Sequence, residues 1–67
     1  MSDFTIQSNT GLAGVALITP NNEDAYDYLV SECDLHVMAN GSAPVDAEII
    51  GDFISDASGA YLDVEYL

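Results

Sequence analysis

The chain has 67 residues, with 12 Asp and Glu, no Lys or Arg, and a formal net charge of -12 at pH 7. The missing cations exclude direct binding to nucleic acid or to an anionic membrane, because both need Lys or Arg to meet phosphates. Hydrophobic residues make up 49%, too many for a disordered acidic tail. We therefore expect one compact acidic domain over residues 1–67, since a chain this short can bury only a single core.

The single cysteine, Cys33, excludes a disulfide within the chain. Secreted chains of this length usually carry several disulfides, so a reducing setting is favoured. The N-terminal segment has Asp3 where a signal peptide would carry cations, and the apolar run 11–19 is too short to span a bilayer. The expected location is the cytoplasm.

Two short strands are the first elements expected along the chain. Residues 4–7 alternate apolar and polar, which is typical of a half-buried strand. Residues 8–11 are all turn formers, and the apolar run 14–19 predicts a second, more buried strand. The connection is short, so we expect the two strands to pair as a hairpin.

A helix is expected from Glu23 to about Cys33. Pro20 ends the preceding strand, and Asn21 or Asn22 supplies the N-cap. The helix has one apolar stripe and an acidic outer face, as its spacing of three and four indicates. The stripe is Ala25, Leu29 and Cys33, flanked by Tyr26 and Val30, and the outer face is Asp24, Asp27, Ser31 and Asp34.

The second half of the chain predicts a strand, a helix and a strand. Residues 35–39 alternate and predict the third strand, and residues 40–42 form a loop. A helix then starts near Ser42 or Ala43, with Pro44 at an early position, and ends at residues 58–59. Its apolar stripe is Val45, Ile49, Phe53 and Ala57, with Ile50 and Ile54 beside it, and Asp46, Glu48, Asp52 and Asp56 fall outside.

The C-terminal residues 61–67 alternate most clearly and predict the last strand. Leu62, Val64 and Tyr66 would face one way, with Tyr66 in the core, and Tyr61, Asp63, Glu65 and Leu67 the other. The order is strand, strand, helix, strand, helix, strand. The expected fold is α+β, with two helices on one face of a sheet of about four strands.

The residues that could support catalysis or metal binding are too few. One Cys and one His, Cys33 and His36, fall short of a structural zinc site, and they lack an oxyanion donor for nucleophilic catalysis. The EF-hand ligand spacing is absent, and so short a chain can hardly enclose a sugar cleft between paired carboxylates. We expect no enzyme activity, cofactor or metal.

The spacing of the acids is the strongest functional feature. Acids two apart on a strand, such as Asp63 and Glu65, lie about 6.5 to 7 Å apart at Cα. Acids three or four apart on a helix lie about 5 to 6 Å apart at Cβ. Phosphates along one nucleic-acid strand have comparable separation, so the expected partner is a basic nucleic-acid-binding protein. The candidate contact residues are Asp24, Asp27, Asp34, Asp46, Glu48, Asp52, Asp56, Asp63 and Glu65.

Tyr28 and Tyr61 are candidate packing anchors in such a contact, because tyrosine buries an apolar ring and keeps a polar tip. The alternative is that both line the rim of the domain's own core.

In its length, its lack of enzyme motifs, its acidity and acidic helix faces such as Asp24/Asp27 and Asp52/Asp56, the chain resembles the small acidic phage-encoded DNA-mimic inhibitors. This class includes many anti-CRISPR proteins, anti-restriction proteins and uracil-DNA glycosylase inhibitors. An anti-CRISPR resemblance implies binding to the positively charged DNA-binding groove of a Cas effector complex, for example where the PAM is read. A restriction or DNA-repair enzyme is an alternative target.

Two further alternatives involve no DNA mimicry. The acidity could serve solubility in the high salt of a halophile, or it could let an antitoxin-like module neutralise a basic partner.

Overall fold

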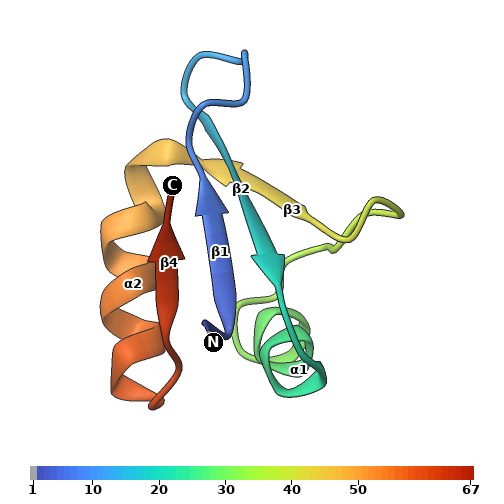
Figure 1. Ribbon diagram of the computed structural model, residues 1–67, viewed down its shortest axis with the longest axis vertical. Coiled ribbons are helices and arrows are strands. Elements are labelled where there is room, and N and C mark those ends of the chain that lie inside the picture. Colours follow the sequence, from blue (N-terminus) through green and yellow to red (C-terminus); the bar gives the residue numbers. More distant parts are fainter. Residues whose placement is uncertain (1) are drawn as a thin grey trace.

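A four-stranded mixed sheet with two helices on one face makes up the fold of residues 2–67, the part of the chain that this computed structural model describes (Figure 1). The elements are β1 (Phe4–Gln7), β2 (Val15–Pro20), α1 (Glu23–Ser31), β3 (Ala43–Asp46), the 3-10 turn η1 (Ala47–Ile49), α2 (Ile50–Gly59) and β4 (Val64–Tyr66). The strand order in the sheet is β3-β2-β1-β4. The α+β class, with a four-stranded sheet and two helices, is confirmed, while the order of elements differs in detail from the expected one.

The N-terminal hairpin forms the centre of the sheet. β1 and β2 pair antiparallel, with Ile6 opposite Ile18. Gly11 and Gly14 both have positive φ in the connection, a conformation that glycine adopts without steric cost. β3 adds antiparallel to β2, and β4 adds parallel to β1. The expected hairpin is therefore confirmed, and both later strands are edge strands.

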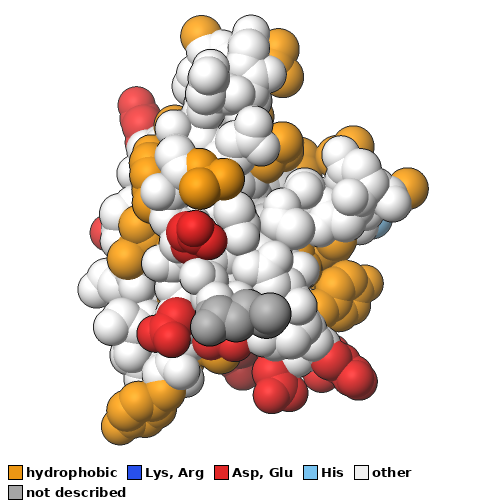
Figure 2. All heavy atoms as spheres, viewed as in Figure 1, with side chains coloured by type: hydrophobic (Ala, Val, Ile, Leu, Met, Phe, Trp, Pro, Cys, Tyr) orange, Lys and Arg blue, Asp and Glu red, His pale blue; other side chains and the backbone are white. Residues whose placement is uncertain are grey.

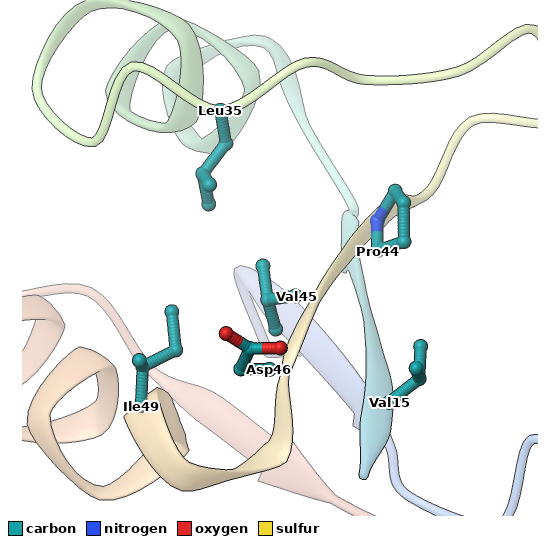
Figure 3. A pocket seen from close by; sticks show the side chains of 6 residues that line it. All are labelled: Val15, Leu35, Pro44, Val45, Asp46 and Ile49. Carbon is teal, nitrogen blue, oxygen red and sulfur yellow. The ribbon is translucent and has the colours of Figure 1, made fainter. Parts of the chain in front are cut away.

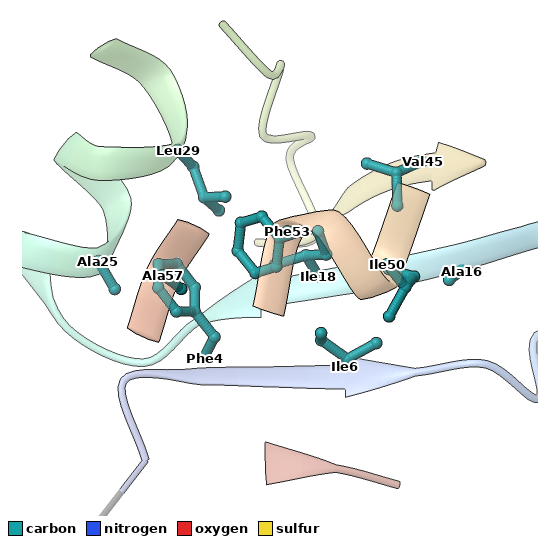
Figure 4. Close-up of a cluster of buried hydrophobic side chains, with 10 residues drawn as sticks. All are labelled: Phe4, Ile6, Ala16, Ile18, Ala25, Leu29, Val45, Ile50, Phe53 and Ala57. Atoms are coloured by element: carbon teal, nitrogen blue, oxygen red, sulfur yellow. The ribbon is translucent and has the colours of Figure 1, made fainter. Parts of the chain in front are cut away.

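The core lies between the sheet and the two helices (Figure 4). Its residues come from β1, β2, β3, α1 and α2: Phe4, Ile6, Ala16, Ile18, Val45, Ala25, Leu29, Ile50, Phe53 and Ala57. Phe4 and Phe53 meet edge to face, with ring centroids 5.1 Å apart, and Tyr28 lies 6.0 Å from Phe4. This aromatic contact joins β1, α1 and α2, so it holds both helices to the same face.

The predicted third strand is wrong. Residues 35–39 lie outside the sheet, and β3 instead consists of residues 43–46, which we expected to start the second helix. The alternation at residues 35–39 reflects packing, because Leu35 and Val37 contact the core from an irregular segment. Pro44 fits an edge strand, since it has no N–H to leave unpaired. The second helix consequently starts later, with α2 at Ile50 after η1.

Several helix and strand details also differ. Asn22 is the N-cap of α1, as predicted, but the helix ends at Ser31 and not near Cys33. Ala25 and Leu29 are buried as expected, and Tyr26 and Val30 beside them are exposed. Tyr66 was expected in the core but is 55% exposed, because three-residue β4 is the edge of the sheet with no strand beyond it.

The aromatic contact at the core gives a first prediction. Replacing Phe53 by Ala removes a ring that is 5% exposed and touches Phe4 and Tyr28. We expect a loss of about 3–5 kcal/mol of unfolding free energy, measured by urea denaturation followed by circular dichroism. Leu12→Ala is the control, because Leu12 is 65% exposed and its truncation should leave the midpoint unchanged. Equal midpoints for the two variants would contradict this core.

Candidate functional site

The carboxylates lie at the molecular surface. All 12 Asp and Glu are exposed except Asp3, which is half-buried. The chain has no Lys or Arg with which any of them could pair. The nine acids predicted as contact residues are therefore all accessible, and the structure brings them together in different groups.

One group of carboxylates gathers where β1, α1 and β4 begin. Asp3 accepts a hydrogen bond of 2.7 Å from the side-chain amide of Asn22 and another of 2.9 Å from the backbone N–H of Asp63. Asn22 caps α1, so Glu23 and Asp24 in the first turn lie at this same end of the molecule. We call Asp3, Glu23, Asp24 and Asp63 the acidic end. Figure 2 shows acidic side chains gathered over the end of the molecule that holds α1.

The hydrogen bonds at the acidic end change the ionisation of Asp3. The backbone N–H of Asp63, and next the Asn22 amide, lower the pKa of Asp3 because both donate to its ionised form. The acidic end is thus held together by neutral donors in place of cations.

Tyr61 lies two residues before Asp63 and is 95% exposed. Its backbone has φ 63, the left-handed region in which a bulky residue is strained, and its N–H donates to the carbonyl of Ser58. Glycine is the usual residue at such a position after a helix. The core does not use this ring, so the core-rim alternative is wrong for Tyr61, and its role as a packing anchor stays a prediction.

A second surface is a hollow of about 390 Å³ between α1 and α2. Its apolar lining is contributed by both helices, η1 and the segment after α1: Tyr28, Cys33, Leu35, Ile49 and Phe53. Three carboxylates, Glu32, Asp52 and Asp56, line it as well. Tyr28 is half-buried against Phe4 and Phe53, so the core-rim alternative applies to this tyrosine.

Next to the hollow between the helices, another hollow of about 420 Å³ lies along β3 (Figure 3). Leu35 and Ile49 line both hollows. They point toward each other across the hollow along β3, with Val45 and Asp46 of β3 between them. We call the two hollows together the helix groove. It has an apolar floor and the carboxylates Glu32, Asp46, Asp52 and Asp56 along it.

Two ionisable groups in the groove have shifted pKa values. Burial raises the pKa of Tyr28, and the neighbouring Cys33 and the carboxylates Asp56 and Glu32 add to the effect. Burial also raises the pKa of the Cys33 thiol, followed by the charge of Asp56. Cys33 is therefore kept as a neutral thiol, which is the unreactive form.

The predicted contact residues divide among these surfaces. Asp24 and Asp63 belong to the acidic end, and Asp46, Asp52, Asp56 and Tyr28 to the helix groove. The remaining acids are exposed but belong to neither surface: Asp27, Asp34, Glu48 and Glu65.

Several residues of both surfaces were not among the predicted contact residues. Glu32 stands four residues after Tyr28, a spacing that would have placed both on one helix face. Asp3 gave no local signal, because its partner Asp63 is 60 residues away in the chain. Leu35 and Ile49 were assigned to a strand and a helix stripe, and not to a surface.

No group of three or more His, Cys, Asp or Glu side chains within residues 2–67 is arranged to hold a metal ion. Across the same residues, neither helix is long and apolar enough to cross a membrane.

Comparisons with protein-family models, with curated proteins and with solved structures gave no match to this chain. We therefore infer its function from the geometry of its own surfaces.

The pKa of Asp3 gives a second prediction. A lowered pKa means that ionised Asp3 stabilises the fold above the ordinary carboxyl pKa, and that this stabilisation is lost as the pH falls through the lowered value. Asp3→Ala should therefore be less stable than wild type at pH 7, and the difference should vanish in strong acid. Urea midpoints of both proteins across this pH range measure it.

Glu48→Ala is the matched control for Asp3→Ala, because it removes one exposed carboxylate that makes no side-chain hydrogen bond among the described residues. It corrects for the repulsion relieved by losing any negative charge. A stability difference between Asp3→Ala and Glu48→Ala that does not change with pH would contradict the assigned role of Asp3.

Proposed function

We propose that this protein is a stoichiometric inhibitor that occupies the positively charged DNA-binding groove of another protein, presenting carboxylates where DNA presents phosphates. A Cas effector complex in the host bacterial cytoplasm, for example at its PAM-reading groove, is the first target. The observation that supports this is the surface position of the acids, uninterrupted by any Lys or Arg. The protein would act by binding and not by catalysis.

The spacing of carboxylates on α2 also supports the proposal. Asp52 and Asp56 lie one helical turn apart, a rise of about 6 Å along the axis. Each strand of DNA carries one charge per about 3.4 Å of axis along a wound path, so phosphates along a strand have a similar separation. A basic groove built for DNA would attract such a row, and the charge would speed their encounter.

Restriction and DNA-repair enzymes remain alternative targets with the same chemistry. An antitoxin-like module would differ in its folding, because a chain that is unfolded alone and folds only with its partner would favour that function.

A competition experiment tests the proposal. A purified Cas effector complex is mixed with the protein and with labelled target DNA, and DNA binding is measured by gel shift. We expect equimolar protein to block DNA binding, excess duplex DNA to displace the protein, and added salt to weaken the complex because salt screens charges. If the protein and duplex DNA bind the effector together, charge mimicry at the DNA-binding groove of that effector is excluded.

Paired neutralisations locate the surface used. Asp24→Asn with Asp63→Asn changes the acidic end, and Asp52→Asn with Asp56→Asn changes the α2 side of the helix groove. Asp27→Asn with Glu65→Gln is the control. It also removes two negative charges, but both residues lie outside the acidic end and the helix groove. We expect one of the first two pairs to weaken inhibition by about tenfold or more, as for truncated charge pairs at interfaces, while the control inhibits like wild type. If all three double variants inhibited equally well, the proposal would be overturned.

The halophile alternative predicts a different dependence of stability on salt. Self-repulsion among the acids is screened as the Debye length falls from about 30 Å at 0.01 M to about 8 Å at 0.15 M salt. We therefore expect the thermal midpoint to rise over this range and then level off, with the protein folded throughout. Melting curves by circular dichroism measure it. A protein that folds only in molar salt would favour the halophile function.

A further inference from the structure

We propose that the helix groove binds a basic amphipathic helix of the partner protein. The apolar face of that helix would lie on the floor around Leu35 and Ile49, and its Lys or Arg side chains would lie against Glu32, Asp52 and Asp56. This inference deepens the proposed function and rests on it for the positive charge of the partner.

The floor of the groove is apolar surface that the fold itself leaves uncovered. Ile49 is 40% exposed although it sits in η1 between β3 and α2, where neighbouring Val45 and Ile50 are buried. Leu35 faces Ile49 from the opposite wall, and Val45 lies between them (Figure 3). Ile49 is exposed and Leu35 is half-buried, so the two leave adjoining apolar surface above buried Val45, next to a charged rim. Uncovered apolar surface rimmed by polar residues is a feature of protein-binding sites.

The rim of the groove determines the charge of its occupant. Glu32 follows the end of α1, and Asp52 and Asp56 lie on α2, so carboxylates come from both walls of the first hollow. The chain has no Lys or Arg to neutralise them. Burial first, and then the charges of Asp56 and Glu32, raise the pKa of Tyr28 and of Cys33, which line the same hollow as these carboxylates. A cation there would therefore be stabilised.

A second copy of this chain does not fit the groove. Its net charge is also -12, so another acidic surface would face the four carboxylates of the groove without a cation between them. Like charges brought together in this way oppose binding.

An added β-strand does not fit either, although β3 borders the groove. The N–H of Ala47 donates to the carbonyl of Gly14, so the backbone of Ala47 faces β2. Successive residues of an antiparallel strand face alternate sides, so the backbone groups of Pro44 and Asp46 face the free edge of β3. Pro44 has no N–H, and the carbonyl of Ser42 already accepts from Met38. A helix needs none of these edge groups, because its backbone hydrogen bonds are internal.

A synthetic peptide tests the inference. The probe is an amphipathic Leu/Lys helix of about 14 residues, roughly 21 Å long, with Leu at i, i+3, i+4 and i+7. Its scrambled counterpart has the same composition but no apolar face. We expect saturable binding of the amphipathic peptide to the full chain, with chemical-shift changes in 15N-labelled protein centred on Leu35, Ile49 and Asp52. The scrambled peptide should bind at least about tenfold more weakly.

Matched variants separate the floor from the rim. Ile49→Ser should weaken binding of the amphipathic peptide by about tenfold, as expected for losing one buried aliphatic contact. Leu12→Ser is its control, since Leu12 is exposed and does not line the groove. Asp52→Asn with Asp56→Asn should weaken binding and reduce its salt dependence, while Asp27→Asn with Glu65→Gln should weaken it less. Circular dichroism confirms that each variant is folded.

Three results would overturn the inference. They are equal binding of the scrambled peptide, shift changes confined to the acidic end or the open face of the sheet, and a dimer of this chain that excludes the peptide. Shift mapping on the wild-type protein decides the matter even where a variant fails to fold.

The two proposals can fail separately. Peptide binding in the groove by a protein that blocks no DNA binding would overturn the inhibitor function alone. If a folded Ile49→Ser variant inhibited as well as wild type, only the proposed binding of a helix in the groove would be overturned.

Discussion

Unpaired negative charge is the constraint on which the rest of this structure depends. With 12 acids and no Lys or Arg, no side-chain salt bridge to either residue can join one element to another. The acids therefore point outward, and folding must overcome their mutual repulsion. Neutral donors take the place of cations: the Asn22 amide and the Asp63 N–H hold Asp3, and the Asn21 amide donates to Thr5 and to the backbone of Ser2. Burial of the apolar core supplies the main favourable term.

The same core arrangement produces the helix groove. The Phe4–Phe53–Tyr28 contact holds both helices to one face of the sheet, with α1 against β2 and α2 beside β4 (Figure 1). Residues of both helices line the first hollow of the groove. The chain after α1 turns back at Asp34, whose φ of 53 is left-handed, and the N–H of Leu35 then donates to the carbonyl of Leu29. Leu35 thus lines both hollows of the groove without covering Ile49, which is 40% exposed.

Local signals were enough to predict part of this fold. The hairpin and the start of α1 follow from a run of turn residues and from the Asn22 cap, which act within a few residues. The third strand was wrong because residues 35–39 and 43–46 both alternate, and only pairing with β2 distinguishes them. Val45 and Ile49 are spaced like a helix stripe although one lies in a strand. The surface position of each acid was predictable, but the grouping of Asp3 with Asp63 was not, because it depends on tertiary contact.

Charge alone attracts many basic partners, so it explains encounter better than selectivity. The apolar floor around Ile49 adds a requirement for shape, because only a partner with a complementary apolar face can cover it. Many DNA-binding proteins read the major groove with a helix that carries Lys or Arg toward the phosphates and bases. A groove that held such a helix would cover the element of the partner that contacts DNA. Charge mimicry and helix binding would then both contribute to competition with DNA for the same partner. The acids would attract basic partners, and the apolar floor would bind only those with a complementary apolar face.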